Sequence, residues 1–166
     1  GVAMRLQVII ETNAGLEAAH EIAFASDRVD SLLFGGVDLA ADLRCAYGWE
    51  PLLYARSRVV HAAASAGIDA IDVPWLDLAD MDGMREEACK AAALGYTGKG
   101  AIHPRQIAAL NEVFTPTAEQ IAYARKVVDA FAGADSGVVV VDGKLIEKPV
   151  LRTMHRILAV ADRAAG

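Results

Sequence analysis

Four short apolar runs, each followed by a segment with helical periodicity, constrain the fold of this sequence more than any other feature. The expected strands are 6–10, 31–34, 68–73 and 100–102. The expected helices are 16–25, 51–66, 81–94 and one that starts at 103. Strands that alternate with helices form a parallel sheet covered by helices. The pattern predicts an α/β fold, either an open doubly wound sheet or part of a (β/α)₈ barrel.

The pattern changes after a further helix expected at 117–131. Two β-rich runs at 138–147 flank Asp142-Gly143, a pair typical of a tight hairpin turn. A final helix is expected from Pro149. The C-terminal segment therefore reads as a hairpin followed by a helix.

Composition narrows the class of protein. With 166 residues, 54% of them hydrophobic, the chain can fill one core but not two large domains. The net charge of -6 argues against nucleic acid, which needs a basic face. Cys45 and Cys89 lack CxxC spacing, which fits a reducing cytoplasm. Since no apolar stretch approaches about 18 residues, we expect no membrane or export segment, and partners that are small molecules or other subunits.

Two carboxylates follow the first two expected strands, Glu11 after Val8-Ile9-Ile10 and Asp38 after Phe34-Gly35-Gly36-Val37. Carboxyl ends of neighbouring parallel strands lie on one side of a sheet, about 4.8 Å apart, so both side chains can converge on one hard cation. Taken singly, each acid is more often a helix N-terminal residue that favours the helix dipole. As a pair, they predict a metal site.

Five ordered motifs carry a resemblance to a known family. They are Val8-Ile9-Ile10-Glu11-Thr12-Asn13-Ala14-Gly15-Leu16, Phe34-Gly35-Gly36-Val37-Asp38-Leu39, Ala70-Ile71-Asp72, the segment 95–107 that contains Gly98-Lys99-Gly100-Ala101-Ile102-His103-Pro104, and Asp142-Gly143-Lys144-Leu145-Ile146-Glu147-Lys148-Pro149-Val150-Leu151. Together they resemble the citrate lyase beta-subunit-like branch of the HpcH/HpaI aldolase superfamily. The resemblance covers nearly the whole chain.

This resemblance implies a (β/α)₈ barrel of the TIM type, of which the chain matches mainly the second half, plus the C-terminal hairpin and helix. It divides the chain into a partial barrel with the metal site, 1–132, and a C-terminal part, 133–166, that packs on a neighbouring subunit. The family's N-terminal barrel half, with its arginine for an oxo-acid carboxylate, has no counterpart here. We therefore expect a fragment or a truncated form that pairs with something else.

The resemblance also implies an activity, that of a Mg²⁺-dependent carbon–carbon lyase or Claisen-type condensing enzyme. Its substrates would be a 2-oxo or hydroxy acid and an acyl-CoA or acyl carrier thioester, and the protein would be a homo-oligomer, a trimer or hexamer. Glu11 and Asp38 would bind the metal. Breaking the bond leaves an enolate, whose oxygen charge a cation stabilises.

Other site residues follow from the same resemblance. The backbone of Gly35, Gly36 and Val37 would cradle the oxo-acid carboxylate. The CoA side of the site would be bordered by Lys99, Ile102, His103 and Pro104. Lys99 would pair with a phosphate, although an exposed lysine is usually only solvated. For His103, a hydrogen bond within the loop is as good an interpretation as a substrate contact.

Glu147 is the candidate proton-transfer residue, acting in the site of a neighbouring subunit. Most members of the family carry an aspartate at this position. Glutamate has similar acidity but one extra methylene, and a displacement near 1 Å can cost about 100-fold in rate. Glu147 is therefore either a working substitute or a sign of changed activity.

Three alternatives stay open at this point. The same site could serve a malyl-type CoA thioesterase, or an aldolase that does not use CoA. The chain could instead be a non-catalytic truncated subunit that acts as an assembly module.

Overall fold

The structure is a computed structural model that describes residues 4–134 and 137–165. It contains two compact units, the first ending at Phe114 and the second beginning at Thr115. The sequence pattern placed the boundary later, between residues 132 and 133. The helix at 118–132 packs with the C-terminal hairpin and the last helix, and so belongs to the second unit.

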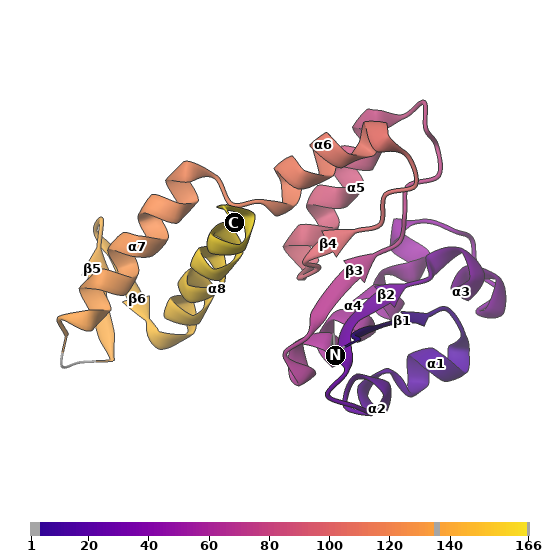
Figure 1. Cartoon of the computed structure of the whole chain (residues 1–166), viewed down its shortest axis with the longest axis horizontal. Coiled ribbons are helices and arrows are strands. Elements are labelled where there is room, and N and C mark those ends of the chain that lie inside the picture. Colours follow the sequence, from indigo (N-terminus) through magenta and orange to yellow (C-terminus); the bar gives the residue numbers. More distant parts are fainter. Residues whose placement is uncertain (1–3, 135–136, 166) are drawn as a thin grey trace. The chain divides into compact units, whose positions relative to one another are not determined.

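The first unit is built on a four-stranded parallel sheet (Figure 1). Its strands are β1 (Leu6–Ile10), β2 (Val29–Phe34), β3 (Asp69–Asp72) and β4 (Gly98–Lys99). They lie side by side in sequence order, β1-β2-β3-β4, and every neighbouring pair is parallel. The predicted α/β class is confirmed, as a parallel sheet with helices that forms no closed barrel within the described residues.

In the described part of the first unit, six helices connect or follow these strands. They are α1 (Asn13–Glu17), α2 (Ala19–Ala23), α3 (Gly36–Asp42), α4 (Trp49–Ala66), α5 (Met81–Leu94) and α6 (Pro104–Phe114). The single helix expected at 16–25 is two short helices that meet at Ala18. Strand β4 begins two residues before the expected strand 100–102, so that prediction was wrong.

One face of the sheet is buried under helices. Ile10, Leu32 and Phe34 are almost completely inaccessible to solvent and belong to the main core cluster. The same cluster contains Leu52 and Val59 of α4. Because side chains alternate along a strand, burial of this row fixes which residues point to the other face.

The opposite face is apolar but more open. Ile9, Leu33 and Ile71 lie in register across β1, β2 and β3. Ile9 is 49% exposed, and the other two are half-buried. In an open sheet with one covered face, such a row would normally be polar.

The parallel register brings the carboxyl ends of all four strands to one edge. Ile10 pairs with Phe34 at the ends of β1 and β2. Asp72 pairs with Lys99 at the ends of β3 and β4. The residues that follow or end these strands are therefore neighbours at this edge.

The second unit contains α7 (Ala118–Ala132), the antiparallel hairpin β5 (Val138–Val141) and β6 (Lys144–Glu147), and α8 (Lys148–Ala165). Its core includes Val127, Val141 and Ile146. Both turn residues, Asp142 and Gly143, have positive φ, as a tight two-residue turn requires, so the predicted hairpin is confirmed. Across the described part of the chain, none of the helices combines the length and hydrophobicity needed to cross a bilayer.

Candidate functional site

The loops after β1 and β2 are in direct contact at the strand-end edge. The Gly35 N–H donates to the Ile10 carbonyl at 2.9 Å, which extends the β1–β2 ladder by one residue. A Cβ added to Gly35 would lie 2.4 Å from the Glu11 Cβ, so only glycine fits here without a backbone shift. Helix α3 begins at Gly36, and Asp38 lies in its first turn. The fold thus brings the segments of Glu11 and Asp38 together.

Both carboxylates are accessible to ligands. Glu11 and Asp38 are exposed, and neither forms a salt bridge within the described residues. The nearby Asp42 instead accepts a hydrogen bond from the Asn13 N–H at 2.5 Å. Within residues 4–134 and 137–165, no three His, Cys, Asp or Glu side chains gather as a metal site. Two exposed carboxylates fit Mg²⁺, which keeps several waters and takes one or two protein ligands.

The predicted backbone cradle is modified by the structure. Because the Gly35 N–H already donates to Ile10, it is not free for a ligand. A Cβ on Gly36 would lie 2.8 Å from the Phe34 ring, so this glycine is required for packing. Val37 is 42% exposed. A role for Gly36 and Val37 in binding a carboxylate stays a prediction, whereas the Gly35 amide has a structural partner.

Lys99 does not face a ligand, which corrects the expectation that it borders the CoA path. Its Nζ donates to Asp72 Oδ2 at 2.7 Å and to Glu87 Oε1 at 2.6 Å. The Lys99 side chain is fully buried. An ammonium held by two carboxylates inside the protein cannot pair with a phosphate in solution.

A fourth charged residue, Arg56 of α4, completes this buried charge cluster. Its Nε donates to Asp72 Oδ1 at 3.0 Å, and its Nη2 lies 3.5 Å from Glu87 Oε1. The guanidinium stacks between Phe34 and Trp49, at 4.9 and 4.7 Å from their ring centres. Two cations thereby neutralise two carboxylates, and the cluster ties α4 and α5 to the ends of β3 and β4.

Sequence reasoning missed Arg56, although a signal for it existed. It lies four residues after Leu52 and three before Val59, within the apolar stripe of α4. A charge at such a position requires a buried partner. Tyr96 packs on the same residue and donates to the Arg56 carbonyl at 3.3 Å. Burial, aided by the Asp72 carboxylate, raises the pKa of the Tyr96 hydroxyl well above its usual range.

The loop after β4 presents the remaining predicted residues. Ile102 is 53% exposed, Pro104 is exposed and His103 is half-buried. The His103 Nδ1 accepts a hydrogen bond from the Arg105 N–H at 3.2 Å. This contact agrees with the interpretation of His103 as a residue that hydrogen-bonds within its own loop.

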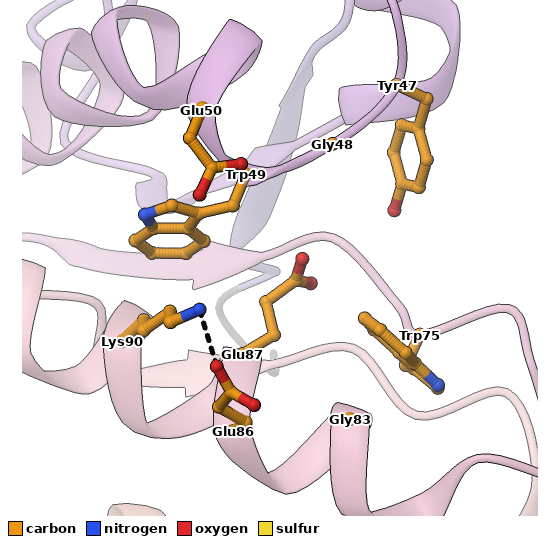
Figure 2. Close-up of a pocket in the computed structure, with 9 residues that line it drawn as sticks. All are labelled: Tyr47, Gly48, Trp49, Glu50, Trp75, Gly83, Glu86, Glu87 and Lys90. Carbon is orange, nitrogen blue, oxygen red and sulfur yellow. Dashed lines mark ion pairs between the residues drawn. The ribbon is translucent and has the colours of Figure 1, made fainter.

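A pocket of about 330 Å³ lies between the start of α4 and the helix α5. Figure 2 shows Trp49 and Trp75 on opposite sides of it, with the Glu87 side chain between them. Lys90 and Glu86 form an ion pair at 2.7 Å along one wall. Burial, together with the charge of Glu87, raises the pKa of Tyr47, which also lines the pocket. The pocket therefore adjoins the buried charge cluster through Glu87.

Glu147 lies in the second unit. It is the last residue of β6, is exposed, and pairs across the hairpin with Val138. Its role as a proton-transfer group for another subunit stays a prediction.

Comparison with known proteins identifies the family. The profile of the HpcH/HpaI aldolase/citrate lyase family matches residues 2–104, which include both strand-end acids. The chain belongs to this family. The resemblance inferred from the sequence motifs is thereby confirmed.

Individual proteins match a longer part of this chain than the family profile does. Citrate lyase subunit beta of Escherichia coli strain K12 is 36% identical over 95% of this chain and 54% of its own length. The mitochondrial citramalyl-CoA lyase of Rattus norvegicus is 36% identical over 80% of this chain and 41% of its own. The crystal structure of CitE from Mycobacterium tuberculosis, in complex with magnesium, acetoacetate and coenzyme A, is 31% identical over 95% of this chain and 61% of that one, with a TM-score of 0.79. The chain spans about half the length of the curated relatives it matches.

Proposed function

We propose that this member of the HpcH/HpaI family is the metal-binding part of a Mg²⁺-dependent carbon–carbon lyase. Its substrate would be a hydroxy acid bound as a thioester to CoA or to an acyl carrier. Cleavage of the carbon–carbon bond would give a 2-oxo acid and a shorter acyl thioester. The names of the relatives, which include citrate lyase, citramalyl-CoA lyase and malyl-CoA lyase, support this class.

One observation carries the proposal: the close approach of Gly35 to Glu11, with Asp38 one helical turn further on. A Cβ at Gly35 would overlap Glu11, so the two loops can approach this closely only because residue 35 is a glycine. Both acids remain exposed and free of salt bridges within the described part of the chain. Exposed carboxylates on adjoining loops are the kind of ligand that Mg²⁺ takes, because it binds through one or two carboxylates and keeps several waters.

Glu11 and Asp38 would hold the metal, and the backbone of Gly36 and Val37 would orient a carboxylate beside it. When bound, Mg²⁺ would supply the positive charge that stabilises an enolate oxygen. Ile102, His103 and Pro104 would border the thioester arm. Glu147 of a neighbouring subunit would move the proton at the acyl carbon, in a homo-oligomer of three or six chains.

We further infer that the sheet is part of a (β/α)₈ barrel. Consecutive strand order is expected for a barrel, whereas a doubly wound sheet reverses order at a switch point. The partly open row of Ile9, Leu33 and Ile71 also suits the packed interior of a barrel.

The absence of a disulfide between Cys45 and Cys89 is compatible with a cytoplasmic location.

Titration with MgCl₂ followed by calorimetry tests the metal site. The wild-type chain should bind one Mg²⁺, and binding should fall at least about 10-fold in Glu11→Gln and in Asp38→Asn because each loses a ligand charge. Glu21→Gln, which removes an exposed carboxylate of α2, is the matched control. Equal Mg²⁺ affinity in all four proteins would reject the site.

Product analysis separates the lyase from the other activities on this site. A lyase converts a malyl-type CoA thioester into a 2-oxo acid and a shorter acyl-CoA. A thioesterase releases free CoA and the hydroxy acid, and a CoA-independent aldolase cleaves only the free acid. Chromatography of the products after incubation with MgCl₂ distinguishes these outcomes.

A further inference from the structure

We propose that Gln106 is a positioning residue that joins the loop after β3 to the loop after β4, and thereby fixes the segment that carries Ile102 and His103. This role deepens the proposed function, since that segment is expected to border the thioester arm of the substrate. Gln106 acts through its neighbours and would not contact the substrate itself.

The hydrogen bonds of Gln106 connect three backbone positions. Its Oε1 accepts from the N–H of Ile102 at 2.9 Å and from that of His103 at 3.3 Å. Its Nε2 donates to the carbonyl of Trp75 at 2.9 Å. The residue is completely buried. A buried amide with its acceptor doubly used and a donor bound to a different loop is held in one orientation.

Two independent contacts join the start of the loop after β4 to the end of β3 and to the loop that follows it. The Gly100 N–H donates to the Asp72 carbonyl at 2.9 Å. A Cβ added to Gly100 would lie 2.9 Å from the Pro74 Cγ, so the two loops pack without a gap. Gln106 therefore joins backbones that are already in contact, and its hydrogen bonds fix the position of one loop relative to the other.

The consequence for His103 concerns its ring. The Nδ1 accepts from the Arg105 N–H, so the neutral ring carries its proton on Nε2. The Gln106 Oε1 holds the backbone of the same residue. The loop after β4 thus presents one imidazole donor and the exposed side chain of Ile102 from a fixed backbone. If the Gln106 bridge is lost, this segment can move relative to the loop after β3.

Two substitutions of the full chain separate positioning from packing. Gln106→Leu keeps a similar volume but removes all three side-chain hydrogen bonds of this residue. Gln106→Glu keeps an acceptor for Ile102 and His103, whereas its ionised carboxylate cannot donate to Trp75. Burial raises the pKa of such a carboxyl, and protonation at lower pH restores the donor.

Amide hydrogen exchange is the first measurement. In Gln106→Leu, the protection of the Ile102 and His103 amides should fall about 5- to 10-fold, because each amide loses its one hydrogen bond to the Gln106 Oε1. In Gln106→Glu, at a pH above the pKa of the new carboxyl, those amides should stay protected. The Asp80 amide, whose hydrogen bond to the Asp77 carbonyl lies in the loop after β3, should then exchange about 5-fold faster because that loop has lost its anchor at Trp75. The amide of Val59, in the core of α4, is the control for global opening.

The second measurement is the affinity for coenzyme A, followed by calorimetry. Both variants should bind it about 5-fold more weakly, and lowering the pH should restore the affinity of Gln106→Glu but not that of Gln106→Leu. If the wild-type chain does not bind coenzyme A, the proposed function loses support, and hydrogen exchange alone decides the bridge. Unchanged exchange of Ile102, His103 and Asp80, or an equal increase at Val59, would overturn the positioning role.

Discussion

The sheet edge carries two pairs of charged residues in contrasting environments. After β1 and β2, Glu11 and Asp38 are exposed and have no cationic partner within the described residues. At the ends of β3 and β4, Asp72 and Lys99 are buried and bound to each other. Both pairs follow from the same βα repeat, yet only the first is open to a ligand.

The difference lies in what surrounds each strand end. At β3 and β4, Arg56 and Glu87 enter from α4 and α5 and complete a neutral cluster. At β1 and β2, the two loops instead meet at Gly35, which contributes no side chain, and no salt bridge of the described residues involves Glu11 or Asp38. A carboxylate at a strand end is thus a candidate metal ligand only where no helix supplies it with a cation.

The largest expected effect tests the buried pair. Lys99→Met should lower the free energy of unfolding by about 3–5 kcal/mol, because Asp72 and Glu87 would then share Arg56 alone inside the protein. Urea unfolding followed by circular dichroism measures this loss.

Lys90→Met is the matched control for that prediction. Lys90 pairs with Glu86 on the exposed face of α5, where solvent screens the interaction. Its loss should be far smaller. Similar losses in the two variants would show that burial does not distinguish the two kinds of ion pair, and the comparison would fail.

An intermediate effect is expected at the open pair. Gly35→Ala should cost about 1–3 kcal/mol, because the new Cβ overlaps Glu11 and forces the loops apart. Gly133→Ala makes the same change at a position with similar φ, -96° against -89°, and meets no atom within 4 Å. Its effect should stay within about 0.5 kcal/mol. Urea unfolding compares the two, and an equal cost would reject the close approach of Gly35 to Glu11.

The smallest effect is a pH dependence near the buried cluster. The folded state keeps Tyr96 protonated above its ordinary pKa of 10.0, so it binds more protons than the unfolded state there, and stability should fall as the pH rises through that value. The slope approaches about 1.4 kcal/mol per pH unit for one proton. Tyr96→Phe should reduce the slope and cost about 1 kcal/mol at neutral pH through the lost hydrogen bond to Arg56. Unfolding curves from pH 8 to 11 measure the slope and the loss of stability. Tyr54→Phe, which changes an exposed ring, is the control. If the slope is the same in Tyr96→Phe as in the wild type, the pH dependence does not come from Tyr96.

Local patterns in the sequence predicted much of the fold. The run 6–10, the helix 81–94 and the Asp142-Gly143 turn lie where periodicity and turn chemistry placed them. Helix α3 was given no bounds, although Asp38 was considered as a helix N-terminal acid, because Gly35-Gly36 interrupts the apolar pattern before it. Strand β4 was displaced because its Gly98-Lys99 sequence has no β-rich character, and only pairing with β3 makes it a strand.

The candidate site was predictable to a different degree. The neighbourhood of Glu11 and Asp38 follows from parallel strands alone. The burial of Lys99 does not, because its partners Asp72 and Glu87 lie 27 and 12 residues away and reach it only through tertiary packing. Gln106 was missed although it lies three residues after His103 at the start of α6, which is the spacing of a capping box.

The pocket between α4 and α5 gives this protein an optical property. Trp49 and Trp75 are the two tryptophans of the chain, and both line that pocket. Excitation at the red edge of the indole band therefore reports on one small region. A shift of the emission maximum would report a separation of α4 from the loop after β3. The second unit contains no tryptophan and would not contribute to this emission.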